Sequence, residues 1–183
     1  MKISKIRRLA LDAMLAAMFV VLSLFSINLP GMKITLDSLP ILVGALLLGP
    51  LDGLAVGLIG SFINQMITYG FTATTLLWIL PAGLRGLIVG SYAKRHGFSM
   101  SLRQTIFITV ISALLVTALN TLLLYVDSWV YSYSYAAALM TLVLRIVAGI
   151  LTAVVFSLIL PAILRALRRL FGDAQEKSAQ TED

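Results

Sequence analysis

Two arginines, Arg85 and Arg145, lie in the middle of long apolar segments that are otherwise typical of membrane spans. A guanidinium group keeps its charge in a protein, so inside a membrane it must face protein, water or an anionic ligand. Each arginine lies about 9 or 10 residues from the outer end of its predicted helix, which at about 1.5 Å per residue places both roughly 14 Å inside the membrane. Two cations at one depth indicate a polar site within a helix bundle.

Other polar and aromatic side chains occupy the outer half or the middle of the same predicted helices. Aromatic rings can stack on a flat ligand, while an arginine can bind its anionic group. Each residue also has a structural alternative: Asn and Thr join neighbouring helices, tyrosines gather at membrane interfaces, and a buried arginine can bind backbone carbonyls. The predicted substrate-binding residues are Arg85, Arg145, Asn64, Thr68, Trp78, Asn120 and Tyr131, with Gln65, Tyr125 and Tyr133 as further candidates.

The composition predicts an integral membrane protein. Of the 183 residues, 60% are hydrophobic and 12% are charged, and the mean hydropathy is +0.99. A soluble domain of this size cannot bury so much apolar surface. With both termini in the cytoplasm, eleven of the fourteen Lys and Arg residues are cytoplasmic, Lys33 is outside, and Arg85 and Arg145 are in spans. The net charge of +6 is therefore that of a basic membrane surface, and we expect no nucleic-acid partner.

The hydropathy pattern predicts an all-α membrane protein, a six-transmembrane-helix bundle with both termini cytoplasmic. The bundle occupies residues 1–170, and a polar, disordered cytoplasmic tail follows at 171–183. Its second span begins after Ser38, a helix cap, and is too short to cross alone. Pro81 is expected to kink the fourth span, residues 32–38 to form an ordered outer loop, and residues 127–135 an aromatic outer belt. The spans are 9–27, 39–49, 51–69, 76–92, 104–126 and 136–164.

The residues needed for catalysis are missing from these spans. The single histidine, His96, lies in a cytoplasmic loop, there is no cysteine, and no metalloprotease, serine-hydrolase or phosphate-loop motif is present. No acid lies at the depth of the two arginines, which weakens the case for an ion-coupled carrier. The sequence therefore predicts no enzyme, no cofactor and no metal site. If the chain transports a molecule, another subunit supplies the energy.

A stripe of small residues, Ala10, Ala13 and Ala17, follows one side of the first span. Small residues at this spacing favour close docking of another helix. The spacing alone leaves open whether that helix belongs to a partner protein or to this chain.

Several sequence strings, in this order and on six spans of this size, resemble the substrate-binding S component of an energy-coupling factor (ECF) vitamin transporter. The resemblance implies a vitamin-capture subunit in a bacterial plasma membrane that works with a membrane coupling protein and two ATPase subunits. It implies that Ala13 and Ala17 dock on the coupling protein, and that the loop 28–37, with Lys33 and Asp37, is a lid over the ligand. The strings lie at 7–10, 13–17, 31–34, 39–44, 48–53 and 84–90.

The ligand and two rival functions stay open at this point. The strings at 39–44 and 48–53 are most similar to a folate- and pantothenate-like branch, whereas residues 69–80 depart from it. The arginines favour an anionic vitamin, folate-like or another. A non-catalytic membrane scaffold of the cell-shape type would bind partners but no small molecule. A stand-alone secondary carrier would transport without ATPases.

Overall fold

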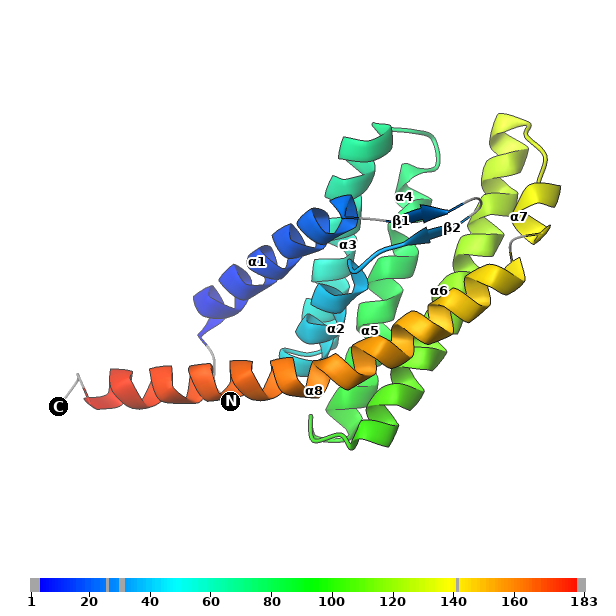
Figure 1. The fold of residues 1–183 in the computed structure, drawn as a ribbon. Helices are drawn as coiled ribbons and strands as arrows, with labels where there is room; N and C mark the ends of the chain where they lie inside the picture. The colour runs from blue at the N-terminus through cyan, green and yellow to red at the C-terminus, as the bar shows by residue number, and fades with distance from the viewer. Residues whose placement is uncertain (1–3, 26, 30–31, 141, 181–183) are drawn as a thin grey trace.

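The computed structural model describes residues 4–25, 27–29, 32–140 and 142–180 of the chain. Most of these residues are helical, and one antiparallel hairpin lies between the first two helices (Figure 1). In chain order the elements are α1 (Lys5–Leu24), β1 (Ile27–Leu29), β2 (Met32–Ile34), α2 (Ser38–Leu47), α3 (Pro50–Tyr69), α4 (Thr75–Trp78), α5 (Leu80–Arg95), α6 (Leu102–Tyr131), α7 (Ala136–Met140) and α8 (Leu142–Gln180).

The short helix α2 lies at the centre of the bundle. Its residues 40–46 are all buried, as is typical of a helix that is hydrophobic on every side. It packs against α1, α3, α5 and α8. At 10 residues, α2 is too short to cross a membrane by itself, and these neighbours enclose it.

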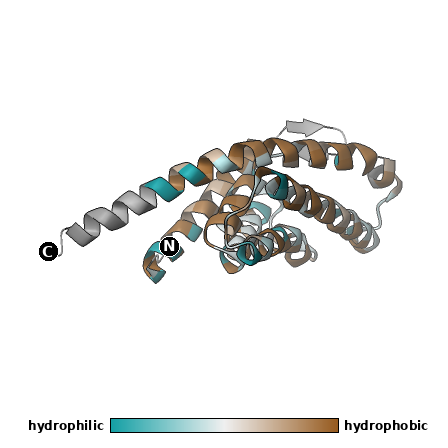
Figure 2. Cartoon of the chain, turned by 90° about the horizontal axis from the view of Figure 1, so that it is seen from below, coloured by the Kyte–Doolittle hydropathy of each residue, from teal (hydrophilic) through white to brown (hydrophobic). Residues whose placement is uncertain are grey.

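Four helical segments in the described part of the chain are long and apolar enough to cross a membrane: Pro50–Tyr69, Thr75–Arg95, Leu102–Tyr131 and Leu142–Arg169. Figure 2 shows hydrophobic residues on the outer sides of the helices as well as between them, and hydrophilic residues where α8 leaves the bundle. An apolar outer surface suits contact with lipid. The predicted helical membrane bundle is confirmed in this form, whereas the count of six spans and the cytoplasmic position of both termini stay predictions.

Several helix boundaries differ from those predicted. Helix α6 continues to Tyr131, so Asp127 lies on a helix and not in a belt loop. The predicted fourth span is divided at Ile79, where Pro81 occupies the first turn of α5 and suits a helix start. Helix α8 continues to Gln180, through most of the segment predicted as a disordered tail, because Ala, Gln, Glu and Lys in that segment are good helix formers.

The connection from α1 to α2 also differs from the predicted loop. It contains the hairpin of β1 and β2, in which Asn28 pairs with Lys33 (Figure 1), and β2 packs against α8. The cap of α2 is Asp37, whereas the sequence predicts Ser38. Ser38 begins the helix instead, and its hydroxyl takes part in the contact with Arg85 described below.

Candidate ligand-binding site

Two adjoining cavities lie in the half of the bundle that the sequence predicts to face outward. One, of about 470 Å³, is lined mainly from α6 and α8, and the other, of about 350 Å³, mainly from α3, α5 and the start of α2. Volumes of this size suit small-molecule ligands. The cavities share six residues, so we describe them as the α8 lobe and the α3 lobe of one site. The shared residues are Thr35, Ser38, Tyr69, Trp78, Arg85 and Asn120.

Arg85 lies between the two lobes. Its Nη1 donates a hydrogen bond to Ser38 Oγ, which donates to Asp37 Oδ1 over 3.2 Å. The nearest acid is thus reached through a serine. The Arg85 Nε is buried and has no hydrogen-bond partner among the described residues. An unpaired buried N–H group costs about 1–3 kcal/mol, so a ligand that accepts this hydrogen bond would remove that cost.

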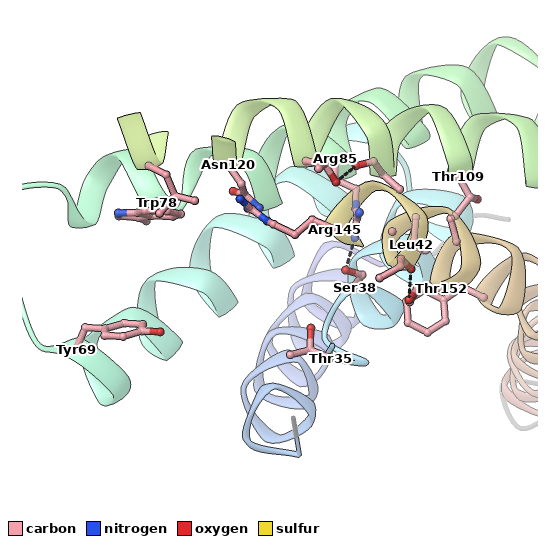
Figure 3. A pocket seen from close by; sticks show the side chains of 17 residues that line it. Thr35, Ser38, Leu42, Tyr69, Trp78, Arg85, Thr109, Asn120, Arg145 and Thr152 are labelled. Atoms are coloured by element: carbon pink, nitrogen blue, oxygen red, sulfur yellow. Dashed lines mark hydrogen bonds between the residues drawn. The ribbon is translucent and has the colours of Figure 1, made fainter. Parts of the chain in front are cut away.

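Arg145 brings a second positive charge to the α8 lobe (Figure 3). Its Nη1 is also buried without a partner in the part of the chain that the structure describes. Among the described residues that line this lobe, none is acidic. Two guanidinium groups with free donors, and no carboxylate beside them in the lobe, favour an anionic ligand, because carboxylate and phosphate oxygens match the planar donor geometry of arginine.

Two of the aromatic residues that line the site, Trp78 and Tyr69, lie apart from the arginines, and Phe19 and Phe156 line it as well. Trp78 and Tyr69 line both lobes, and in Figure 3 their rings lie toward one end of the view, with Asn120 between Trp78 and the arginines. Flat aromatic faces suit stacking on a planar ligand. The arrangement therefore fits a ligand with a ring at one end and an anionic group at the other.

Asp127 fixes the position of Trp78. Its Oδ1 accepts hydrogen bonds from Thr74 Oγ1 at 2.6 Å and from Trp78 Nε1 at 3.4 Å, and its Oδ2 accepts from the Tyr133 hydroxyl at 2.9 Å. Partial burial, the hydrogen bond to Asp127 and its charge raise the pKa of Tyr133 to about 12, so the phenol stays a donor at neutral pH. One carboxylate thus joins α4, α6 and the turn after α6.

We expect Asp127→Ala to lower the free energy of unfolding by about 1–3 kcal/mol, because the buried Thr74 hydroxyl loses its acceptor. Trp78 should also lose its fixed orientation, and ligand affinity should fall. The change is measurable by tryptophan fluorescence in a Trp129→Phe background, since Trp129 is the only other tryptophan and is 82% exposed. The control is Ser134→Ala, at an exposed position. Equal behaviour of the two variants would contradict this positioning role.

Asn64, on α3, faces the α3 lobe and also joins two helices. Its Oδ1 lies 2.7 Å from Ser23 Oγ on α1 and 3.4 Å from Thr68 Oγ1 one turn along α3. Gln65 lines the same lobe. The structural and the ligand-binding interpretations of Asn64 are therefore compatible, because one amide oxygen in the interhelical contact leaves the rest of the amide for the cavity.

The predicted site residues fall into three groups. Arg85, Arg145, Asn64, Trp78 and Asn120 line the two lobes, as does Asp37 of the predicted lid. Thr68 and Tyr131 are exposed and do not line them, and Ala13 and Ala17 are exposed on α1. The side chain of Lys33 lies outside the described residues.

The structure adds lining residues that the sequence prediction omits. Tyr69 lines both lobes, whereas the candidate Tyr125 packs edge-on against Tyr135, with ring centres 5.4 Å apart. Ser38 and three threonines of α6 and α8 also line the α8 lobe: Thr109, Thr117 and Thr152. The threonine hydroxyls each donate to a carbonyl one turn back, an ordinary helix contact that gives no sequence signal of a site.

Comparison with known families identifies the chain. A family model described as "ECF-type riboflavin transporter, S component" matches residues 3–169. The chain belongs to this family. Its members are transporter components rather than enzymes, and the apolar helices agree with a multi-pass protein of the bacterial cell membrane.

Individual relatives are similar to parts of the chain. A "UPF0397 protein" of Streptococcus thermophilus is 28% identical over 144 residues, which is 72% of this S component and 78% of the relative. A "UPF0397 protein" of Streptococcus pneumoniae is 38% identical over 82 residues, 43% of each chain.

Solved structures of S components have a similar fold. The S component of a bacterial ECF transporter superposes with a TM-score of 0.62 and 18% identity over 92% of this chain and 99% of the other. FolT bound with folic acid superposes with a TM-score of 0.60 and 19% identity, over 81% of this chain and 93% of FolT. An S component for biotin superposes with a TM-score of 0.56 and 18% identity, over 92% of this chain and 95% of the other. At such identities the likeness shows the fold alone.

Proposed function

We propose that this chain is the substrate-binding subunit of an ATP-driven ECF-type importer, and that it captures an anionic, ring-bearing vitamin or related small molecule from outside the cell. One observation carries the proposal. Arg85 and Arg145 line one cavity with no acidic lining residue, and each has a buried N–H group without a partner among the described residues.

The chemistry of the cavity narrows the ligand class. The aromatic end, with Trp78 and Tyr69, suits a planar ring, and the arginines suit a carboxylate or phosphate. The family description names riboflavin, which is neutral, and FolT binds folic acid, which is a carboxylic acid. Folate-like vitamins and riboflavin 5′-phosphate are anionic, so they fit the proposed site beside the two arginines better than riboflavin itself.

The energy for transport would come from partner subunits. The sequence contains no phosphate-loop motif, so we assign ATP hydrolysis to two ATPase subunits joined to this chain through a membrane coupling protein. The exposed Ala13 and Ala17 on α1 are the proposed docking surface for the coupling protein.

A vitamin panel tests the proposal directly. The purified chain is mixed with riboflavin, riboflavin 5′-phosphate, folate, pantothenate and biotin, and its thermal midpoint is followed over a range of concentrations. A bound ligand should add about 1.4 kcal/mol of stability for each tenfold rise above its dissociation constant. Stabilisation by one vitamin without any ATPase present is the expected result.

The same experiment separates the rival functions. If no vitamin stabilises the chain and no small molecule is extracted with it, the scaffold function is favoured. Ion-dependent flux into liposomes without ATPase subunits would instead favour a secondary carrier.

Ala13→Leu should leave vitamin binding unchanged and reduce uptake in cells that carry the coupling protein and ATPases. A larger side chain on a close-docking helix face costs about 1–3 kcal/mol of association, or about 5- to 150-fold. Met14→Leu, at a neighbouring exposed position of α1, is the control because it conserves volume. Loss of binding by Ala13→Leu would show that the stripe packs within this chain.

A further inference from the structure

A third cavity lies at the other end of the bundle, where α5, α6 and α8 meet. It has a volume of about 200 Å³ and shares no lining residue with the two lobes of the candidate site. Its wall is partly apolar, with Leu46, Phe98 and Leu164, and partly cationic, with Arg165 and Arg168. None of its lining residues is acidic.

Backbone carbonyls hold both of these arginines in place. Arg168 Nη2 donates to Phe98 O at 2.7 Å, which joins α8 to the turn between α5 and α6, and Arg165 Nε donates to Pro161 O at 3.1 Å. A guanidinium has five N–H donors, so each arginine keeps others for a further acceptor. Two guanidinium groups held in this way match the oxygens of a phosphate group.

The turn before α6 has a backbone that favours this arrangement. Phe98 has a φ of 58° and follows Gly97 at 59°. The left-handed region is unusual for an aromatic residue and carries a strain cost. In this conformation the Phe98 N–H donates to Ala93 O at 2.8 Å, its carbonyl accepts from Arg168, and its ring packs against the hydrophobic core. The turn therefore supplies both a contact that fixes a cation and an apolar wall of the pocket.

We propose that this pocket binds the phosphate of an anionic membrane phospholipid. The phosphate lies beside Arg165 and Arg168, and the apolar part of the lipid contacts Leu164 and Phe98. The sequence predicts that these residues lie at the cytoplasmic membrane surface, and basic pockets between spanning helices on that side suit anionic headgroups. A volume of about 200 Å³ suits a headgroup. The apolar wall has no role with a free phosphate ion. This inference does not depend on the identity of the vitamin.

Native mass spectrometry of the full chain in detergent tests the inference with three probes: phosphatidylglycerol, phosphatidylcholine and glycerol 3-phosphate. The test variant is Arg165→Gln with Arg168→Gln. The control is Arg169→Gln, which removes one positive charge, against two in the test variant, from a position on the same helix that is exposed like Arg165 and Arg168 but lies outside the pocket. A hydrogen bond between a charged donor and the phosphate contributes at least about 1.5 kcal/mol, or about tenfold in affinity, so the double variant should bind phosphatidylglycerol about 100-fold more weakly.

The outcomes separate a lipid site from its alternatives. Retention of phosphatidylglycerol by the wild type and by Arg169→Gln, with loss in the double variant and weak phosphatidylcholine binding, supports the inference. An equal loss of lipid affinity per charge removed in Arg169→Gln would mean diffuse attraction to a basic surface, and glycerol 3-phosphate binding as tightly as the lipid would mean a free-anion site; either result overturns it. If the double variant fails to fold, Leu164→Trp fills the pocket without changing charge. Undiminished lipid binding by Leu164→Trp would also overturn the inference.

Discussion

Arg145→Gln and Arg85→Gln are each expected to weaken vitamin binding by about 10- to 150-fold, because a hydrogen bond to a charged group contributes about 1.5–3 kcal/mol. Glutamine keeps polar atoms in the cavity but removes the positive charge. Since both arginines have buried N–H groups without partners among the described residues, neither is already committed to a structural contact through all its donors. Isothermal calorimetry with the vitamin that stabilises the wild type most gives the affinities.

Two controls make this result specific. Arg103→Gln removes an arginine from an exposed position near the start of α6, outside both lobes, and should leave affinity unchanged. A ligand whose acid group is converted to a methyl ester should bind the wild type weakly. Its affinity for the Arg145→Gln variant should be about the same as its affinity for the wild type. If Arg145→Gln lowered the affinity for the ester as much as the affinity for the acid, Arg145 would act through packing and not through charge.

Much of the fold follows from patterns that depend on one helix at a time. A run of apolar residues predicts a membrane span whatever the span packs against. A charged side chain inside a membrane has a high free energy, so Arg85 and Arg145 can be selected as site candidates from the sequence alone. Both predictions can be made without knowing how a helix is rotated against its neighbours. The effect of Pro81 can also be predicted from its own helix alone, and the predicted fourth span is divided at Ile79, close to Pro81.

The remainder of the site depends on pairs of residues that are far apart in the chain. Ser38 meets Arg85 across 47 residues, and Thr74 meets Asp127 across 53. Such contacts depend on how each helix is rotated and tilted against its neighbours, which hydropathy does not determine. Ser38 before an apolar run is typical of a helix cap, so its sequence context favours a local role over its observed contact with Arg85.

Helix rotation also explains the different outcomes for the tyrosines. Aromatic residues near the outer ends of spans are typical of the membrane interface, and the sequence does not distinguish those that face the cavity. Both tyrosines are exposed, yet Tyr69, at the end of α3, lines both lobes, whereas Tyr131, at the end of α6, lines neither. Only the packed bundle separates the two.

Glycines hold α3 and α5 close together, and they give the largest expected effect on stability. A Cβ atom at Gly86 would lie 2.1 Å from the backbone C and O of Gly53, and one at Gly57 would lie 2.5 Å from the carbonyl O of Ala82. Glycines on both helices thus let the two backbones approach closely. A backbone cannot rotate away as a side-chain end can, so an added methyl group must separate the helices.

Gly86→Ala should therefore lower the free energy of unfolding by about 3 kcal/mol, at the upper end of ordinary overpacking, and the thermal midpoint by about 6–12 °C for a chain of this length. Gly44→Ala, inside α2, is the matched control. The nearest atoms to its new Cβ would be Leu15 Cδ1 at 3.4 Å and Val56 Cγ2 at 3.5 Å, both ends of side chains. Its steric cost should be small, and alanine in a helix gains about 1 kcal/mol over glycine. Because Gly86 adjoins Arg85, its variant should also lose vitamin affinity, whereas Gly44→Ala should keep it. Equal stability of the two variants would mean that α3 and α5 are not held at the separation that places Arg85 between the two lobes.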